Sequence, residues 1–231
     1  MRARVYAYTT YMATQRKQQK QSLDLETIVD QASELIADEG FEALTMRRLA
    51  ERCGVTAMSL YRYVQTKEDL LVILANRALE ELDLPDPEGR SWQEEITTVF
   101  RSLHRVLLAH PEFAQITASQ PIDALVAYRG MEVVLATLQR EGLDDEEAVT
   151  AYDALVSFTR GFNQQYTGKR WEAGFQRLSS MRELKADEFP HVVKLAGQLV
   201  TRDPDKHFEE GLELVMRGIE GQIAAKRTSA S

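Results

Sequence analysis

The sequence predicts an all-α protein in which a small N-terminal helical domain precedes a larger helical domain. Apolar residues recur at three- and four-residue steps through most of the 231 residues, and no segment alternates with a period of two. Polar residues suited to helix capping stand before several of these stretches. The segment LPDPEG, residues 84–89, interrupts the pattern and marks the expected domain boundary.

Caps and apolar stripes set the expected limits of each helix. The first stripe starts at Leu25, and Gly40 closes that helix. Thr66 opens T-K-E-D and Ser91 opens S-W-Q-E, and both patterns are capping boxes at helix starts. Residues 167–185 are less regular. Outside the segment 45–67, we expect helices over about 25–40, 66–82, 91–110, 123–140, 144–166, 189–200 and 204–224.

Residues 45–67, TMRRLAERCGVTAMSLYRYVQTK, predict two short helices joined by a tight turn. Ala50 is small where two helices cross closely, and Gly54 supplies the left-handed backbone that ends the first helix. Thr56 is suited to cap the second helix. The pattern favours a helix-turn-helix, which places its second helix in a DNA major groove. An ordinary helical hairpin is the alternative.

Composition excludes several classes of protein. A hydrophobic content of 44% supports a sizeable core, and 28% charged residues are normal for a soluble chain. No stretch approaches the 18 apolar residues of a membrane span, and the N-terminus lacks the apolar core of a secretory signal. The single cysteine, Cys53, excludes an intrachain disulfide and is interpreted as a buried structural thiol. We therefore expect a cytoplasmic protein.

Basic charge is concentrated locally, although the net charge is −8. Residues 1–21 contain basic side chains and no acid, and Met12 offers an alternative start within them. We expect this arm to be disordered, with reach into a DNA minor groove as the alternative. A second basic group surrounds the helix-turn-helix: Arg47, Arg48, Arg52, Arg62 and Lys67. A basic binding surface on an acidic body fits a sequence-specific DNA binder.

The pieces GFEALTMRRLA, CGVTAMSLYRYV and TKEDLL resemble the N-terminal domain of the TetR family of bacterial transcriptional regulators. The resemblance covers about residues 25–82. It implies a DNA-binding regulator, with repression favoured over activation. A helical interaction module that does not bind DNA is a further alternative. The resemblance divides the chain into the arm at 1–21, a three-helix DNA-binding domain at 22–83, and a helical effector-binding and dimerisation domain at 84–226.

The resemblance also implies a set of DNA contacts. Thr45 corresponds to a phosphate-binding residue, with helix capping as its other role. Arg47 corresponds to a groove-facing position, where a guanidinium can read guanine. Arg48 approaches phosphate. The recognition helix starts with Thr56, Ala57, Met58 and Ser59, and Ala57 and Met58 are suited to contact a thymine methyl group. Phosphate or base contacts are further implied for Tyr61, Tyr63 and Lys67, with packing between helices as the structural alternative for the two tyrosines.

The second half resembles the C-terminal domain of the tetracycline repressor subgroup. The segments SWQEEI, LHRVLLAHP, REGLDDEEAV, SFTRGF and FEEGLELVMRGIEGQI carry the likeness over about residues 92–224. By resemblance, helices at about 146–166 and 206–224 form a four-helix dimer interface with their symmetry mates. Their apolar stripes are Ala148, Tyr152, Leu155, Thr159 and Phe162, and Phe208, Leu212, Val215, Ile219 and Ile223. Filling the core of a monomer is the alternative role of these stripes.

The ligand chemistry of that subgroup does not carry over. Ile116 stands where the subgroup has a magnesium-binding histidine, Val99 stands where an amide grips the drug, and Gln165 or a neighbour replaces an acid. Magnesium needs oxygen ligands, so we expect no metal and no cofactor. The sequence instead favours a largely apolar organic effector and a palindromic DNA operator as partners. The candidate pocket residues are Val99, Leu103, Ile116, Met131, Leu135 and Phe162, each of which is also suited to the core.

An enzyme is the other class considered. The four histidines, His104, His110, His191 and His207, have no metal-binding spacing. The sequence also lacks a glycine-rich phosphate loop, a G-x-S-x-G elbow and an H-E-x-x-H motif. We therefore expect a regulator without catalytic activity.

Overall fold

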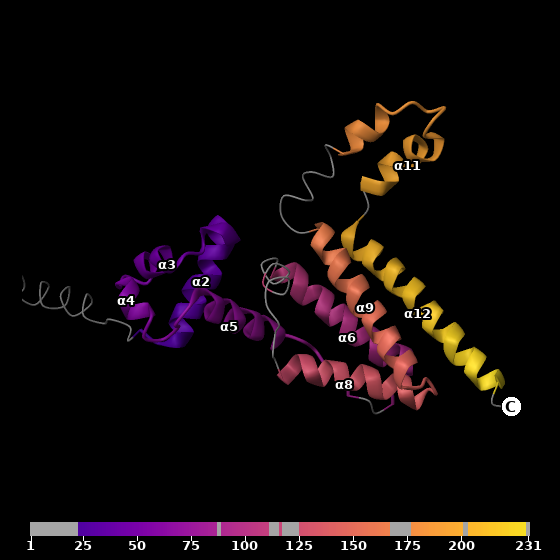
Figure 1. Cartoon of the computed structure of the whole chain (residues 1–231), viewed down its shortest axis with the longest axis horizontal. Coiled ribbons are helices and arrows are strands. Elements are labelled where there is room, and N and C mark those ends of the chain that lie inside the picture. The colour runs from indigo at the N-terminus through magenta and orange to yellow at the C-terminus, as the bar shows by residue number, and fades with distance from the viewer. Residues whose placement is uncertain are drawn as a thin grey trace, which may run out of the picture. The chain divides into compact units, whose positions relative to one another are not determined.

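The computed structural model describes residues 23–86, 89–110, 116, 125–166, 177–200 and 203–229, and every regular element within these ranges is helical (Figure 1). The chain divides into two compact units between Leu74 and Ala75, a point that lies inside helix α5. No helix within the described ranges is long and apolar enough to cross a membrane. The expected arm at 1–21 lies outside the described residues.

The first unit contains α2 (Leu25–Glu39), the short 3-10 helix η1 (Phe41–Ala43), α3 (Met46–Arg52), α4 (Ala57–Leu60) and the start of α5 (Lys67–Leu79). Asp24 begins α2, because its carboxylate accepts a hydrogen bond from the Thr27 amide at 2.8 Å. The predicted stripe of α2 is buried, namely Ile28, Val29, Ala32, Leu35 and Ile36. Thr66 and Asp69 form the reciprocal bonds of the predicted capping box, each 3.0 Å long. Helix α5 ends at Leu79, three residues before the expected end.

The second unit contains α6 (Trp92–Ala109), α8 (Leu125–Arg140), α9 (Asp145–Tyr166), α11 (Pro190–Val200) and α12 (Pro204–Ser229). Ser91 and Glu94 make the predicted capping box of α6. Asp144 and Glu147 make an equivalent pair at the start of α9, with bonds of 3.0 and 3.1 Å. Four expected helices therefore match observed ones closely, whereas α12 continues five residues beyond its expected end. The less regular segment 167–185 is described only from residue 177.

A glycine ends α8 and turns the chain into α9. Gly142 has φ of +104°, and the amides of Gly142 and Leu143 donate to the carbonyls of Gln139 and Leu138 at 3.0 and 3.2 Å. This pair of bonds is a Schellman motif, which needs a left-handed residue. Leu138 and Leu143 are both buried in the same cluster, so the turn also adds to the core.

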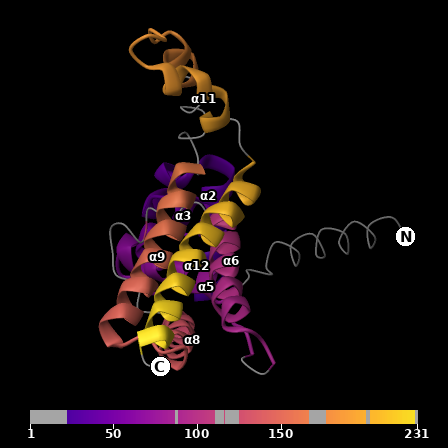
Figure 2. The same ribbon diagram turned by 90° about the vertical axis from the view of Figure 1, so that its right-hand side faces the viewer.

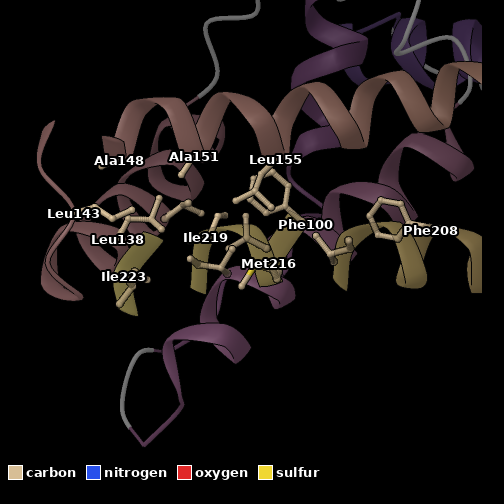
Figure 3. Packing of buried hydrophobic residues seen from close by; sticks show 14 of the residues in the cluster. Phe100, Leu138, Leu143, Ala148, Ala151, Leu155, Phe208, Met216, Ile219 and Ile223 are labelled. Atoms are coloured by element: carbon tan, nitrogen blue, oxygen red, sulfur yellow. The ribbon is translucent and has the colours of Figure 1, made fainter. Parts of the chain in front are cut away.

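Helices α6, α8, α9 and α12 enclose the main core of the second unit. Figure 2 shows α9 and α12 side by side, and Figure 3 shows the buried side chains between the helices, from Leu138, Leu143 and Ile223 at one end to Phe208 at the other. Gly211 of α12 lies so close to Phe158 of α9 that a Cβ atom there would stand 2.5 Å from the ring. The missing side chain at Gly211 therefore lets the two helices pack closely.

This packing changes the interpretation of the two predicted stripes. Ala148, Leu155, Thr159 and Phe162 of α9, and most of the stripe on α12, are buried within a single chain. Tyr152 and Val215 are half-buried against the same cluster. The stripes therefore fill the core of one protomer, which was the alternative, and within them only Tyr152 and Val215 keep some exposed surface.

A buried carboxylate joins α6 to α8. Glu95 is 2% exposed and accepts hydrogen bonds from Arg140 at 2.8 and 3.0 Å and from the Thr137 hydroxyl at 2.7 Å. Burial raises the pKa of Glu95, but the hydrogen bonds from Arg140 and Thr137 outweigh burial and leave the pKa below its usual 4.5. The carboxylate therefore stays charged, and both of its oxygens have donors.

We predict that Arg140→Ala lowers the free energy of unfolding at pH 7 by about 1–3 kcal/mol, because the Glu95 carboxylate loses its charged partner while it stays buried. A carboxyl whose pKa is lowered by folding stabilises the protein above its unfolded pKa and loses that contribution as the pH falls through its folded pKa. The difference between wild type and variant should therefore shrink as the pH falls through 4.5 toward pH 3. Urea unfolding followed by circular dichroism between pH 7 and pH 3 measures it.

The matched control is Arg129→Ala on the exposed part of α8, which should change stability by less than about 0.5 kcal/mol. If Arg140→Ala lowers the free energy of unfolding equally at pH 3 and pH 7, the role assigned to Glu95 is wrong.

Candidate nucleic-acid interface and ligand site

The turn between α3 and α4 has the geometry that the glycine in the motif predicts. Gly54 has φ of +68°, and its amide donates to the Glu51 carbonyl at 3.2 Å. The Val55 amide donates to the Ala50 carbonyl at 3.0 Å, which completes a Schellman motif. Ala50 is 2% exposed, as expected for a residue at a close helix crossing. These contacts fix the direction in which α4 leaves α3.

Cys53 lies beside this turn and is half-buried, which is more exposed than the sequence predicts. Burial still raises the pKa of its thiol, so the reactive thiolate is disfavoured.

Two threonines cap the helices of the motif. The Thr45 hydroxyl accepts from the Arg48 amide at 3.2 Å, and the Thr56 hydroxyl accepts from the Ser59 amide at 3.3 Å. Thr56 also lies 3.0 Å from the Ser59 hydroxyl. Helix α4 is a single turn, so the residues after Leu60 leave the helix and form a turn of their own.

The predicted base-reading side chains are accessible. Met58 is 75% exposed, Tyr61 is 45% exposed and Tyr63 is 44% exposed, whereas Ala57 and Ser59 are half-buried. A methionine that is three-quarters exposed at the start of a helix costs solubility without contributing to the core. Its exposure is therefore consistent with a surface that a partner covers.

The arginines of α3 differ in what they contact. Arg47 has an 88% exposed side chain and pairs with Glu51 of the same helix at 3.0 Å. Arg48 pairs with Glu39 of α2. Arg52 is largely covered and binds Asp38 at 2.7 Å and Glu34 at 3.3 Å, both on α2. Arg52 thus holds α3 to α2, and Arg47 is the most accessible of the three.

Lys67 has a packing contact. Its Nζ lies 5.3 Å from the centre of the Phe41 ring, within the range of a cation–π contact. A lysine in the first turn of α5 is unfavourable for the helix dipole, and the Phe41 ring offsets part of that cost. The ammonium can therefore hold α5 to η1 and remain near the surface.

The six candidate ligand residues lie in or against the packed interior of the second unit. Val99 and Phe162 belong to the main cluster, and Leu103 and Leu135 pack against it. Ile116 is 1% exposed, and Met131 is half-buried. These positions fit a role in the core, which was the alternative for each residue. Their contact with a ligand stays a prediction.

A polar group inside this apolar unit was not predicted from sequence. His104 of α6 is 5% exposed, and its Nδ1 lies 2.9 Å from Oδ1 of Asn163 on α9. Its ring stacks on Phe208 of α12, with centroids 3.8 Å apart and planes 4° apart. Asn163 is fully buried, and its amide donates to the Thr159 carbonyl at 2.8 Å. His104 and Asn163 are 59 positions apart in the sequence, so no local pattern reveals this pair.

Two hollows lie where α6 faces α12. One has a volume of about 430 Å³ and is lined by Thr98, Arg101, His104, Arg105, Asp205 and Glu209. The other has about 420 Å³ and extends along α12 toward Glu220. Arg101 lies on both and holds Glu209 through two hydrogen bonds of 2.8 and 2.7 Å. Within the described ranges, no group of three or more His, Cys, Asp and Glu side chains is arranged to hold a metal ion.

Comparisons with known proteins agree with the two units. Residues 28–73 match the family model described as bacterial regulatory proteins, tetR family. Residues 84–223 match the model described as the tetracyclin repressor-like C-terminal domain. Together the two matches cover both sides of the LPDPEG segment.

Two similar curated proteins are repressors by name. The chain is 30% identical over 222 residues to the HTH-type transcriptional repressor DrrR1 of Streptomyces coeruleorubidus, covering 90% of this chain and 81% of that protein. It is 28% identical over 210 residues to the class D tetracycline repressor protein of Escherichia coli, covering 88% and 92%.

Among solved structures, the chain is similar to ActR of Streptomyces coelicolor in complex with actinorhodin. The TM-score is 0.73 at 32% sequence identity, and the match covers 87% of this chain and 98% of ActR. The apo form of ActR gives a TM-score of 0.74 at the same identity, with coverage of 88% and 97%.

Proposed function

Because this chain belongs to the tetR family of bacterial regulatory proteins, we propose that it represses transcription from a palindromic operator and leaves that operator when a small organic ligand binds. Regulators of this family bind DNA through a helix-turn-helix and are not enzymes. The observation that carries the proposal is the fixed turn at Gly54, beside which Arg47, Met58 and Tyr61 stand exposed. A protein that binds chromosomal DNA in this way works in the cytoplasm.

We assign residues 22–83 to the DNA-binding domain and residues 84–226 to the effector and dimer domain. The two family matches, at 28–73 and 84–223, support this division. Helix α5 is continuous across the boundary between the two compact units. We propose that this helix transmits the effect of ligand binding to the DNA-binding domain. Coupling between two such sites is commonly about 1–3 kcal/mol.

At the DNA, we assign base contacts to Arg47 and to the start of α4, where Ala57 and Met58 offer apolar groups to thymine methyls. Arg48 must exchange Glu39 for a phosphate, so its contribution is smaller. Phosphate contacts fall to Tyr63 and to Lys67, whose position above Phe41 holds it in place. The remaining assigned residues are Thr45, Thr56, Ser59 and Tyr61.

We propose that the protein is a homodimer, because paired helix-turn-helix motifs match paired half-sites. The buried stripes of α9 and α12 cannot serve this purpose, but the opposite faces can. On α12, Leu214 is 67% exposed, and Gly218 and Gly221 have open space at their Cβ positions. On α9, Val149 is 50% exposed. These outward faces are where we place the four-helix interface of the dimer.

For the effector, we retain the expectation of a largely apolar organic compound bound near Val99, Leu103, Ile116, Met131, Leu135 and Phe162. Ile116 has no metal-binding atom, so magnesium is not needed. The complex of ActR with actinorhodin supports an organic ligand for this chain.

The first prediction concerns base readout. Arg47→Ala should weaken operator binding by about 1–3 kcal/mol and relax preference at one base pair, because a bidentate contact to guanine is lost. Glu51→Gln is the matched variant: it frees Arg47 from its intrahelical partner and should strengthen binding. Fluorescence anisotropy with single-base operator variants measures both, and an unchanged base preference in Arg47→Ala would exclude base reading.

The second prediction concerns phosphate contacts. Operator affinity should fall roughly 10³-fold or more between 50 and 200 mM salt, because cations are released from the DNA on binding. Lys67→Ala should weaken binding to all sequences about equally. A change in base preference in that variant would contradict a phosphate role.

The third prediction concerns the dimer. Light scattering should give twice the 26.3 kDa mass of the chain. Leu214→Glu should shift the protein toward monomer with its helical content intact, because a charge is placed at the interface. Ile219→Glu is the comparison: Ile219 is 4% exposed within one chain, so that variant should unfold. A Leu214→Glu protein that stays dimeric at micromolar concentration would place the interface elsewhere.

The fourth prediction concerns release. Titration of the operator complex with a library of apolar organic compounds should find at least one that frees the DNA, and a metal chelator should not prevent it. Release that a chelator abolishes would contradict the metal-free site. A library of varied apolar chemotypes without any active compound would argue against ligand control.

A further inference from the structure

The hydrogen bonds around His104 determine which ring nitrogen carries the proton. The Asn163 amide nitrogen donates to the Thr159 carbonyl at 2.8 Å, so its oxygen is the atom that faces His104. That oxygen only accepts, and it lies 2.9 Å from Nδ1 of His104. Nδ1 is therefore the protonated nitrogen, and in the neutral ring Nε2 carries a lone pair.

Nε2 has no donor. It is buried and makes no hydrogen bond, although Oδ1 of Asp205 lies 3.4 Å away. Burial lowers the pKa of His104 more than Asn163 and Asp205 raise it, so the ring is neutral at pH 7. A lone pair and a carboxylate oxygen then face each other, and an unsatisfied buried acceptor of this kind is destabilising. A hydrogen-bond donor placed between the two atoms would remove that cost.

Two aromatic rings hold the plane of the His104 imidazole. Phe208 stacks on one face at 3.8 Å, and Phe162 meets the ring edge-on at 5.8 Å. His104 and Asp205 both line the hollow of about 430 Å³ between α6 and the first turns of α12, and Nε2 is the ring atom that faces Asp205. Among the described contacts, Asp205 is the polar side chain beside Nε2. This side chain is 79% exposed, so it is free to change rotamer.

The other charged groups of this hollow define the rest of the ligand. Arg101 and Glu209 neutralise each other through paired hydrogen bonds. Arg105 is exposed and has no ion pair within the described part of the chain. Arg105 is thus available to bind an acceptor, Nε2 of His104 lacks a donor, and the planar guanidinium of Arg105 also favours a flat ring.

We propose that this hollow binds a hydroxylated aromatic compound whose hydroxyl group donates to Nε2 of His104 and whose carbonyl or carboxylate oxygen accepts from Arg105. Asp205 moves aside or shares the same hydroxyl proton. The proposal deepens the proposed function and rests on it, because Phe162 belongs both to the apolar ligand region and to the shell around His104. The hollow then supplies the polar end of the effector site.

The experiment uses the full chain and three probes: 3-hydroxybenzoate, benzoate and 3-methoxybenzoate. Calorimetry should give an affinity for 3-hydroxybenzoate roughly 5- to 10-fold above the other two, which is the worth of one neutral hydrogen bond. Arg105→Gln should weaken all three probes by roughly 10-fold or more, because each carboxylate loses a charged donor. His104→Phe keeps a ring on Phe208 and should abolish the preference for the hydroxyl group. His191→Phe, on exposed α11, is the matched control and should keep that preference.

Nitrogen-15 NMR of wild-type imidazole rings gives a readout that does not depend on any variant folding. The free protein should show His104 protonated at Nδ1 only, and 3-hydroxybenzoate should shift its Nε2 resonance while benzoate does not. A proton on Nε2 in the free protein at pH 7, or equal affinities for the three probes, would overturn the proposal.

Operator release is measured separately. If His104→Phe leaves release by apolar compounds unchanged and the wild type binds the three probes equally, the proposed function stands and this site is excluded. If 3-hydroxybenzoate binds selectively but does not release the operator, the binding site stands and its role as an effector site is excluded.

Discussion

The packing of α9 against α12 within one chain is the constraint on which the second unit depends. Each helix has one continuous apolar stripe, and the structure buries those stripes together with residues of α6 and α8. The hydrophobic contribution of such burial is roughly 25 cal/mol per Å² of apolar surface, so these contacts dominate the stability of the unit. Any association with another protomer must use the faces that remain. Those faces carry small residues and few large apolar ones, which favours close helix contact over a broad apolar interface.

The first unit depends on local charge in a different way. Arg48 and Arg52 bind carboxylates of α2, and these pairs orient α3. The same pairs withdraw positive charge from the surface that would meet DNA. The basic group seen in the sequence is therefore partly structural, and recognition rests on fewer side chains than a count of arginines suggests. Exposed ion pairs contribute little to stability, so their effect is mainly on geometry.

Local sequence signals predicted what depends on neighbouring residues. Gly54 predicted a helix end because only glycine readily adopts its backbone angles. Thr66 and Ser91 predicted helix starts because their side chains satisfy free amides. The burial of the apolar stripes followed from periodicity, but their partner did not. A stripe shows that a face is covered, and it does not distinguish another helix of the same chain from a second protomer. The contacts of His104 with Asn163, and of Glu95 with Arg140, join residues far apart in sequence, so no local pattern contains them.

The contact of Phe158 with Gly211 has a mechanical consequence. The ring fits against α12 only where the helix has no side chain, and the residues one turn away on either side are His207 and Val215. Sliding α12 along α9 by one turn, a ratchet of about 5.4 Å, would drive a side chain into the ring. This contact opposes axial sliding of the two helices. A movement of either helix when the protein changes state therefore favours tilt or rotation that keeps their register.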